Sequence, residues 1–344
     1  MLKNFYDKET KTLRVPSYFN QKLKHLVPGI EIIIFEEDYR TNFCSNFNQK
    51  VNNLPNTIKS LTFGWAFNHP VDNLPNSITH LTFGYCFDQP VDNLPSNITN
   101  LTFGHSFNEP VDNLPSNITN LTFGFSFNQP VDNLPQNIKH LTFSSWFNQN
   151  VDNLPNSITH LTFGFSFNKQ VNNLPKNIIY LTFGKKFNKE VGHQGCEDSL
   201  CPRNLPNSIT HLTFDYDFNQ SVDNLPSSIT HLTFGKQFNQ KLDNLPSNII
   251  YLCLQCNFKH CLINLPKTIN ELSYCSCNEI NDVPLNIEKI NINFKCSNII
   301  KNIYNISPNV KIIKIDDVDC LHYLKKIPFG CKVIDIYDNE IFLL

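Results

Sequence analysis

The sequence predicts a mainly β solenoid of about fourteen coils, in which each coil contributes one short parallel strand. Three observations predict this fold. Proline recurs at position 2 of a repeated unit and glycine at position 11, which leaves no room for an ordinary helix. The apolar positions are 1, 5, 8, 10, 14 and 18, a spacing typical of a chain that turns several times around one core. The unit is 20 residues long and begins at Leu54, Leu74, Leu94, Leu114, Leu134, Leu154, Leu174, Leu205, Leu225 and Leu245.

Within one unit, the Leu-Thr-Phe at positions 8 to 10 is expected to form the strand, because inward and outward side chains alternate there. The phenylalanines at positions 10 and 14 are expected to stack as two columns through the core. Asparagine recurs at positions 15 and 20, where it can satisfy turn backbone groups and form ladders along the stack. Ser144, Asp215 and Gln255 replace the glycine of position 11, so that position favours a turn without requiring positive φ.

The regular repeats divide the chain into four segments. Residues 1–26 are expected to form an N-terminal cap and residues 27–53 a degenerate first repeat. Residues 54–264 hold the regular repeats, with an insertion at about 192–202. Residues 265–344 are expected to hold degenerate repeats and a C-terminal cap, because terminal repeats must shield the open end of the core.

Charge and hydropathy exclude several classes of function. The net charge of -2 provides no basic field, so we expect no nucleic-acid partner. No apolar run is long enough to span a membrane, and charges interrupt the first thirty residues, so we expect neither a membrane span nor a secretory signal. Most of the 12 cysteines lie outside the clean repeats, which favours free thiols in a reducing, cytoplasmic compartment.

Two cysteine-containing segments raise the question of a metal. The insertion contains His193, Cys196 and Cys201, whose spacing matches no standard zinc site. Cys253-x-x-Cys256 followed by His260 is closer to a zinc motif, but the repeat register continues through it. We therefore expect no metal and no cofactor. The aspartates at position 19 are interpreted as turn residues rather than calcium ligands.

The candidate binding surface is the exposed face of the strands, at positions 7, 9 and 12. Position 7 supplies a column of histidines, in which His140 and His160 are expected to touch. Position 9 is nearly always threonine, so specificity is expected from the variable residues that follow the strand. Aromatic residues there suit protein recognition. The candidate protein-binding residues are Trp65, Tyr85, His105, Phe125, Phe165, Lys185, Tyr216 and Lys236.

The tract Leu-Pro-x-x-Ile-x-x-Leu-Thr-Phe-Gly-x-x-Phe-Asn resembles the FNIP repeat, a leucine-rich-repeat relative abundant in slime moulds and in giant DNA viruses of amoebae. The resemblance covers Leu54 to Asn264 and implies a curved right-handed solenoid used for protein recognition, in the host cytoplasm if the chain is viral. Many members carry an F-box, which would attach the solenoid to a ubiquitin ligase. Residues 1–53 do not resemble one.

Nothing in the sequence resembles a nucleophile elbow, a phosphate loop or a catalytic constellation of paired carboxylates, so we expect no enzyme activity. The expected function is a non-catalytic scaffold that binds an unknown protein, in an oligomeric state that the sequence does not indicate. Two alternatives stay open. One is the substrate-recognition subunit of a ubiquitin ligase without a visible F-box, and the other is a carbohydrate-active β-solenoid enzyme.

Overall fold

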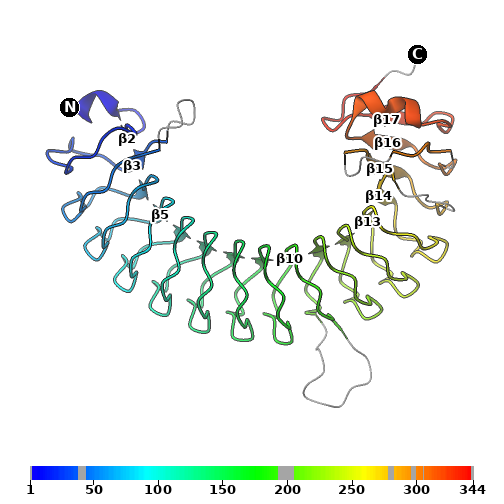
Figure 1. Cartoon of the computed structure of the whole chain (residues 1–344), viewed down its shortest axis with the longest axis horizontal. Coiled ribbons are helices and arrows are strands. Elements are labelled where there is room, and N and C mark those ends of the chain that lie inside the picture. The colour runs from blue at the N-terminus through cyan, green and yellow to red at the C-terminus, as the bar shows by residue number, and fades with distance from the viewer. Residues whose placement is uncertain are drawn as a thin grey trace. The chain divides into compact units, whose positions relative to one another are not determined.

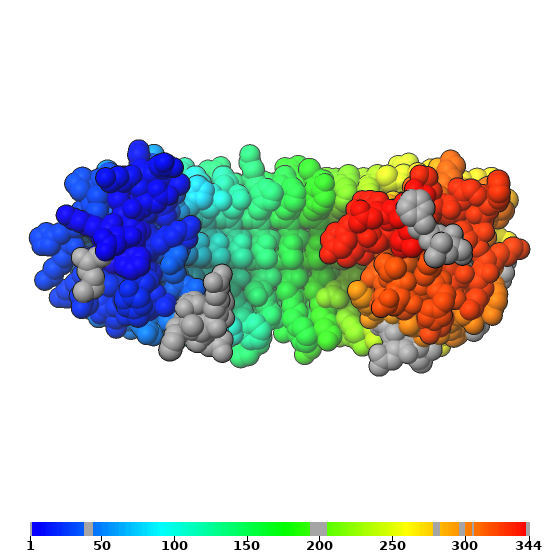
Figure 2. Space-filling model, turned by 90° about the horizontal axis from the view of Figure 1, so that it is seen from above, coloured from blue at the N-terminus to red at the C-terminus, as the bar shows by residue number. Residues whose placement is uncertain are grey.

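The computed structural model describes residues 2–37, 44–192, 205–277, 283–295, 300–304 and 306–341. The chain divides into two compact units, Met1–Phe167 and Asn168–Leu344. Each unit is a β-solenoid with one short strand per coil, as the repeat predicts (Figure 1). Neighbouring coils stand side by side as parallel ridges in the space-filling view (Figure 2). In the described residues, no helix has the length and apolar character needed to cross a bilayer.

The first unit begins with a short 3-10 helix, η1 (Leu2–Phe5), and a strand β1 (Tyr6–Asp7) that pairs antiparallel with β2. From β2 onward each strand pairs in parallel with the next. The stack therefore contains a parallel strand within residues 1–26, the segment expected to be a cap. The strands are β2 (Thr12–Val15), β3 (Ile32–Phe35), β4 (Ser60–Thr62), β5 (His80–Thr82), β6 (Asn100–Thr102), β7 (Asn120–Thr122), β8 (His140–Thr142) and β9 (His160–Thr162).

The second unit continues the same pattern, with parallel pairing from β10 to β17. Its degenerate repeats form strands although the sequence pattern decays there, and a 3-10 helix, η2 (Val318–Tyr323), precedes the last strand. The strands are β10 (Tyr180–Phe183), β11 (His211–Phe214), β12 (His231–Thr233), β13 (Tyr251–Leu254), β14 (Glu271–Cys275), β15 (Lys289–Asn293), β16 (Ile312–Ile315) and β17 (Lys332–Ile334).

Most strands of the regular repeats occupy positions 7 to 9, one residue earlier than the predicted 8 to 10. Pairing is in exact repeat register, so Leu81 lies opposite Leu101 and Thr82 opposite Thr102. The phenylalanine of position 10 still hydrogen-bonds across coils, since the Phe83 amide donates to the Thr102 carbonyl at 2.9 Å. In these coils the strand ends at position 9, and positions 12 and 13 form the turn that follows.

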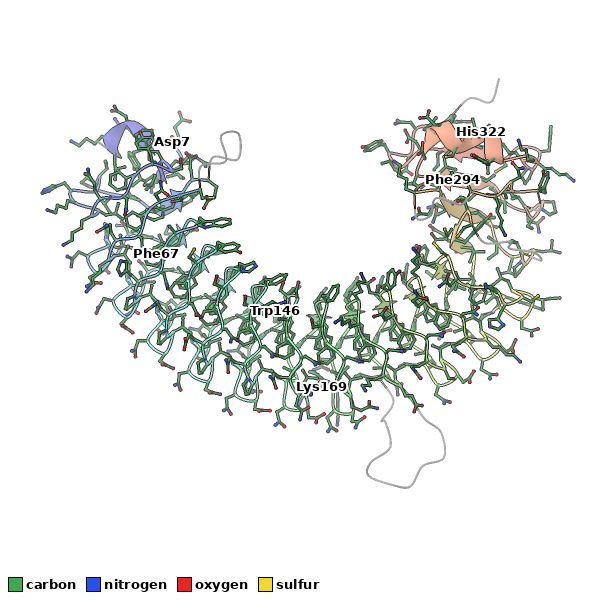
Figure 3. The ribbon with its side chains drawn as sticks, in the orientation of Figure 1. Asp7, Phe67, Trp146, Lys169, Phe294 and His322 are labelled. Atoms are coloured by element: carbon green, nitrogen blue, oxygen red, sulfur yellow. The ribbon has the colours of Figure 1, made fainter. Side chains whose placement is uncertain are left out.

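Two columns of phenylalanine fill the core, as predicted. In the first unit, position-10 rings of successive coils have centroids 5.5–5.7 Å apart, and position-14 rings 6.0–6.1 Å apart. Phe67 and Phe107 are fully buried, and Phe67 is labelled in Figure 3. Because each ring is covered on both sides by the neighbouring coils, the core is a continuous stack rather than a set of separate clusters.

Rows of side chains along the stack accept hydrogen bonds from backbone amides in the turns. The Asn108 carboxamide oxygen accepts from the amide of Asn128 at 2.8 Å, one coil further on, and the same contact recurs along the row. The position-20 asparagines donate to the position-19 aspartate of the preceding coil, as Asn113 does to Asp92 at 3.0 Å. The asparagine ladders are confirmed, and these aspartates accept hydrogen bonds from the asparagines of the next coil.

Glycine is favoured at position 11 because neighbouring coils approach closely there. A Cβ built on Gly104 would lie 1.8 Å from the Gly84 carbonyl oxygen, far inside van der Waals contact. The φ angle is not the reason, since the described glycines with positive φ are Gly29 and Gly330. The prediction that position 11 does not require positive φ is confirmed.

Candidate functional site

Position 12 lies in the turn after each strand and places its side chain on the strand side of the coil. In the first unit this position holds four successive rings, which we call the aromatic ladder: Trp65, Tyr85, His105 and Phe125. Trp65 and Phe125 are 39% and 36% exposed, while Tyr85 and His105 are half-buried between their neighbours. The structure therefore gathers four of the predicted binding residues into one continuous surface feature.

The rings of the aromatic ladder stack face to face. The centroids of Trp65 and Tyr85 lie 3.9 Å apart at an interplanar angle of 4°. Tyr85 and His105 follow at 4.1 Å and 15°, and His105 and Phe125 at 4.6 Å and 7°. Since the faces cover one another, the ladder presents mainly ring edges to solvent. Ring edges carry the positive end of the aromatic quadrupole and favour carbonyl oxygens or the face of another ring.

The spacing of the ladder also shows which side of the first unit is concave. Position-12 centroids are 3.9–4.6 Å apart, whereas the core phenylalanines at equal positions of the same coils are 5.7–6.1 Å apart. The coils of this unit thus converge toward the strand side, as its ribbon shows (Figure 1). The aromatic ladder lies on the inner side of that curve.

Beyond Phe125 the aromatic row moves by one residue. Position 12 of the next coil is Ser145, and Trp146 at position 13 packs against Phe125 with centroids 5.4 Å apart and a tilt of 51°. Trp146 is 56% exposed and lies on the strand side of its coil (Figure 3). Phe165 returns to position 12 and is 42% exposed. The aromatic surface of the first unit therefore extends beyond the ladder.

In the second unit, position 12 has different chemistry. The Lys185 and Lys236 ammonium groups lie 4.7 and 5.7 Å from the centroid of the Tyr216 ring, in cation–π contact. All three side chains are half-buried. Three further predicted residues are thus brought together, as a Lys–Tyr–Lys cluster rather than a purely aromatic row.

A second row of rings runs along position 7. His140 stacks on His160 at 4.2 Å, which confirms the predicted contact, and His211 stacks on His231 at 4.2 Å. Burial lowers the pKa of His160, and the neighbouring His140 lowers it further. Burial and His231 lower the pKa of His211 in the same way. Neutral imidazole is therefore favoured at His160 and at His211.

Charge is segregated in the regular repeats of the first unit. Every aspartate and glutamate between residues 54 and 167 occupies position 15, 16 or 19, and none occupies position 7, 9 or 12. Beside the strands runs a groove of about 550 Å³ whose lining has no carboxylate. It is lined by Ser77, Thr79, Asn97, Thr99, Asn117, Thr119, Asn137 and Lys139.

The zinc motif considered in the sequence is not assembled. Cys253 is a buried strand residue opposite Thr233 and Ser273, and the His260 ring contacts the Asn239 carbonyl at 2.9 Å. The insertion at about 192–202 lies, from His193 on, outside the described residues. Instead, Cys256 lies beside Cys275 and Cys277 of the next coil, a grouping that the sequence analysis missed.

Comparison with known proteins agrees with this architecture. The FNIP Repeat family model matches residues 46–86, 87–126, 110–145, 127–166, 147–186, 198–237 and 221–252. The crystal structure of CroV588, from a giant virus and described as a novel circular LRR protein, is similar, with a TM-score of 0.64 and 30% sequence identity. The similarity covers 94% of this chain but 56% of CroV588, so the chain spans little more than half of that protein. A search of the curated proteins gives no match.

Proposed function

The chain belongs to the FNIP-repeat family, and on that premise we propose that it is a non-catalytic scaffold that binds a partner protein through the aromatic ladder. One observation carries the proposal: four stacked rings lie together on the strand side, with Trp65 and Phe125 exposed at its ends. Exposed aromatic clusters are unusual on surfaces that have no partner, and aromatic anchors dominate the energetics of many protein interfaces.

The geometry indicates the chemistry of the partner surface. Since the ring faces are stacked, a partner meets edges, which suits apolar side chains, aromatic faces and carbonyl oxygens. Because no acidic residue lies at position 7, 9 or 12 of these repeats, the attraction does not depend on basic partner residues. We therefore expect an interface that is mainly apolar and only weakly sensitive to salt.

The non-catalytic part of the proposal rests on the same surface. Neither positions 7, 9 and 12 of the regular repeats in the first unit nor the lining of the adjacent groove offers a pair of carboxylates, which glycoside hydrolysis commonly needs. The groove side chains are also engaged within the solenoid, as when Asn97 donates to the Asn76 carbonyl at 2.8 Å. A carbohydrate-active enzyme therefore has no support at this site.

We also propose a cytoplasmic location, which would be the host cytoplasm for a viral chain. Among the described residues, the thiols of five cysteines are free, and Cys275 is disulfide-bonded; the five are Cys44, Cys86, Cys253, Cys320 and Cys331. Structural disulfides of secreted proteins would more naturally recur with the repeat.

The test is quantitative affinity purification with a triple variant, Trp65→Ser, Tyr85→Ser and Phe125→Ser. We expect the variant to fold, because these side chains lie outside the phenylalanine columns. Partners should be lost, since interface anchors commonly contribute about 2 kcal/mol or more each. Bound proteins are measured by mass spectrometry against the wild type.

The matched control is Pro70→Ser, Pro90→Ser and Pro130→Ser, which changes three exposed position-17 residues in the same coils. It should keep every partner of the wild type. Retention of all partners by the folded aromatic variant would place the binding surface elsewhere.

A further inference from the structure

Three cysteine sulfurs converge in the second unit, where Cys256 continues the position-12 row after Lys236. The Cys275 Sγ lies 3.1 Å from the Cys256 Sγ and 3.0 Å from the Cys277 Sγ. All three sulfurs lie within 4.8 Å of one another. Cys275 is buried, and Cys256 and Cys277 are half-buried.

The repeat register builds this cluster. Cys256 is position 12 of its coil, and Cys275 and Cys277 are positions 11 and 13 of the next. β13 and β14 pair in parallel with Leu254 opposite Tyr274, which brings the turn after one strand onto the turn after the other. The Cys277 thiol also contacts the Cys256 carbonyl at 3.6 Å, so the two turns are held together.

We propose that Cys256, Cys275 and Cys277, in their reduced state, bind a metal ion that prefers sulfur ligands. The ion that we propose is Zn²⁺. Thiolates are soft donors that select zinc and similar ions. Zinc–sulfur bonds of about 2.3 Å in a tetrahedral site place sulfurs about 3.8 Å apart, so the cluster would open by roughly 0.7 Å. The fourth position is taken by water or by another donor.

Metal binding changes the protonation of the three sulfurs. A thiol loses its proton when it binds a divalent metal, so Zn²⁺ binding at this cluster releases protons and weakens as the pH falls.

The site depends on the redox state of Cys275, which is disulfide-bonded in this structure. A two-electron reductant is needed to free it. With a phosphine, the disulfide is cleaved to two thiols while the phosphine and one water become the phosphine oxide. Zn²⁺ then replaces the protons of the three thiols as three Zn–S bonds form. The oxidised chain lacks one of the three donors.

The experiment measures zinc on the full chain by elemental analysis after gel filtration, with and without prior phosphine reduction under anaerobic conditions. We expect one zinc per reduced chain and much less on the oxidised chain. Cobalt(II) is the spectroscopic probe, since sulfur-to-cobalt charge transfer in the near ultraviolet reports thiolate ligation directly.

Two variants and a control decide the assignment. Cys256→Ser and Cys277→Ser should each weaken zinc binding by about tenfold or more, because even an outer-shell partner is worth about 10–100-fold. Cys331→Ser, a half-buried cysteine elsewhere in the unit, should bind zinc like the wild type. Absence of zinc and of the cobalt band in the reduced wild type would overturn the proposal, as would equal zinc in all variants. If a serine variant fails to fold, the near-ultraviolet cobalt band of the reduced wild type still tests whether thiolates bind the metal.

Discussion

In residues 1–167, position 12 of successive coils holds Trp65, Tyr85, His105 and Phe125, whereas in residues 168–344 it holds Lys185, Tyr216 and Lys236. The first set stacks ring on ring, and the second encloses one ring between two ammonium groups. Around both, positions 10 and 14 stay phenylalanine with nearly the same spacing.

This contrast shows how the repeat separates two tasks. The core positions are covered by neighbouring coils on both sides, so a change of volume there disturbs the whole stack. Position 12 lies on the strand side and touches mainly the same position of adjacent coils. Its chemistry can therefore change from aromatic to basic without altering the fold.

The largest expected effect lies in the core. Phe107→Ala in the first unit and Phe238→Ala in the second should each lower the free energy of unfolding by about 3–5 kcal/mol, because both rings are buried. Phe125→Ala should cost only about 1 kcal/mol, since the ring is partly exposed and loses mainly its stacking contacts.

Urea denaturation followed by circular dichroism checks these values, with Tyr216→Ala as the position-12 variant of the second unit. If the alanine variants at positions 12 and 14 lowered the free energy of unfolding equally, position 12 would contribute to stability as much as the core does. They would also mean that the aromatic ladder serves mainly to hold coils together.

A smaller effect concerns pH and the stacked histidines of position 7. The pKa values of His160 and His211 are lowered in the folded chain, so the unfolded chain binds more protons below the ordinary value of about 6.5. The free energy of unfolding should therefore fall as pH drops through about 6.5 toward the lowered values, and these histidines should add no further loss below them.

The matched variant is His140→Asn with His231→Asn, which removes the imidazoles beside His160 and His211. Asparagine is chosen because it occupies position 7 in two other coils, as Asn100 and Asn120. Denaturation at about pH 7 and about pH 5 should show a smaller difference for the variant than for the wild type. An unchanged difference would mean that the stacked pairs are not coupled.

The residues show what the sequence could and could not predict. The phenylalanine columns, the asparagine ladders and the His140–His160 contact followed from the repeat period, because equal positions in parallel coils lie opposite one another. The predicted strand boundaries were one residue too late, because most strands cover positions 7 to 9. The amide of Phe83, at position 10, still hydrogen-bonds to the next coil although the residue lies outside the strand.

Two features were not predicted. The face-to-face stacking of position 12 depends on how the turn tilts each ring and on the local convergence of the coils, which the sequence does not show. The Cys256, Cys275 and Cys277 group escaped notice because its members belong to different coils. Aligning the coil from Leu245 with the coil from Leu265 would have revealed it.

The most direct test of the central claim uses the chain's own tryptophans. Its 2 tryptophans, Trp65 and Trp146, both lie on the aromatic surface and are 39% and 56% exposed. Acrylamide quenching of their fluorescence is measured with the free chain and with a purified, tryptophan-free fragment of a captured partner. If the partner covers the aromatic ladder, quenching should fall clearly on binding. Quenching that stays the same while the partner is bound would contradict the assignment of this surface.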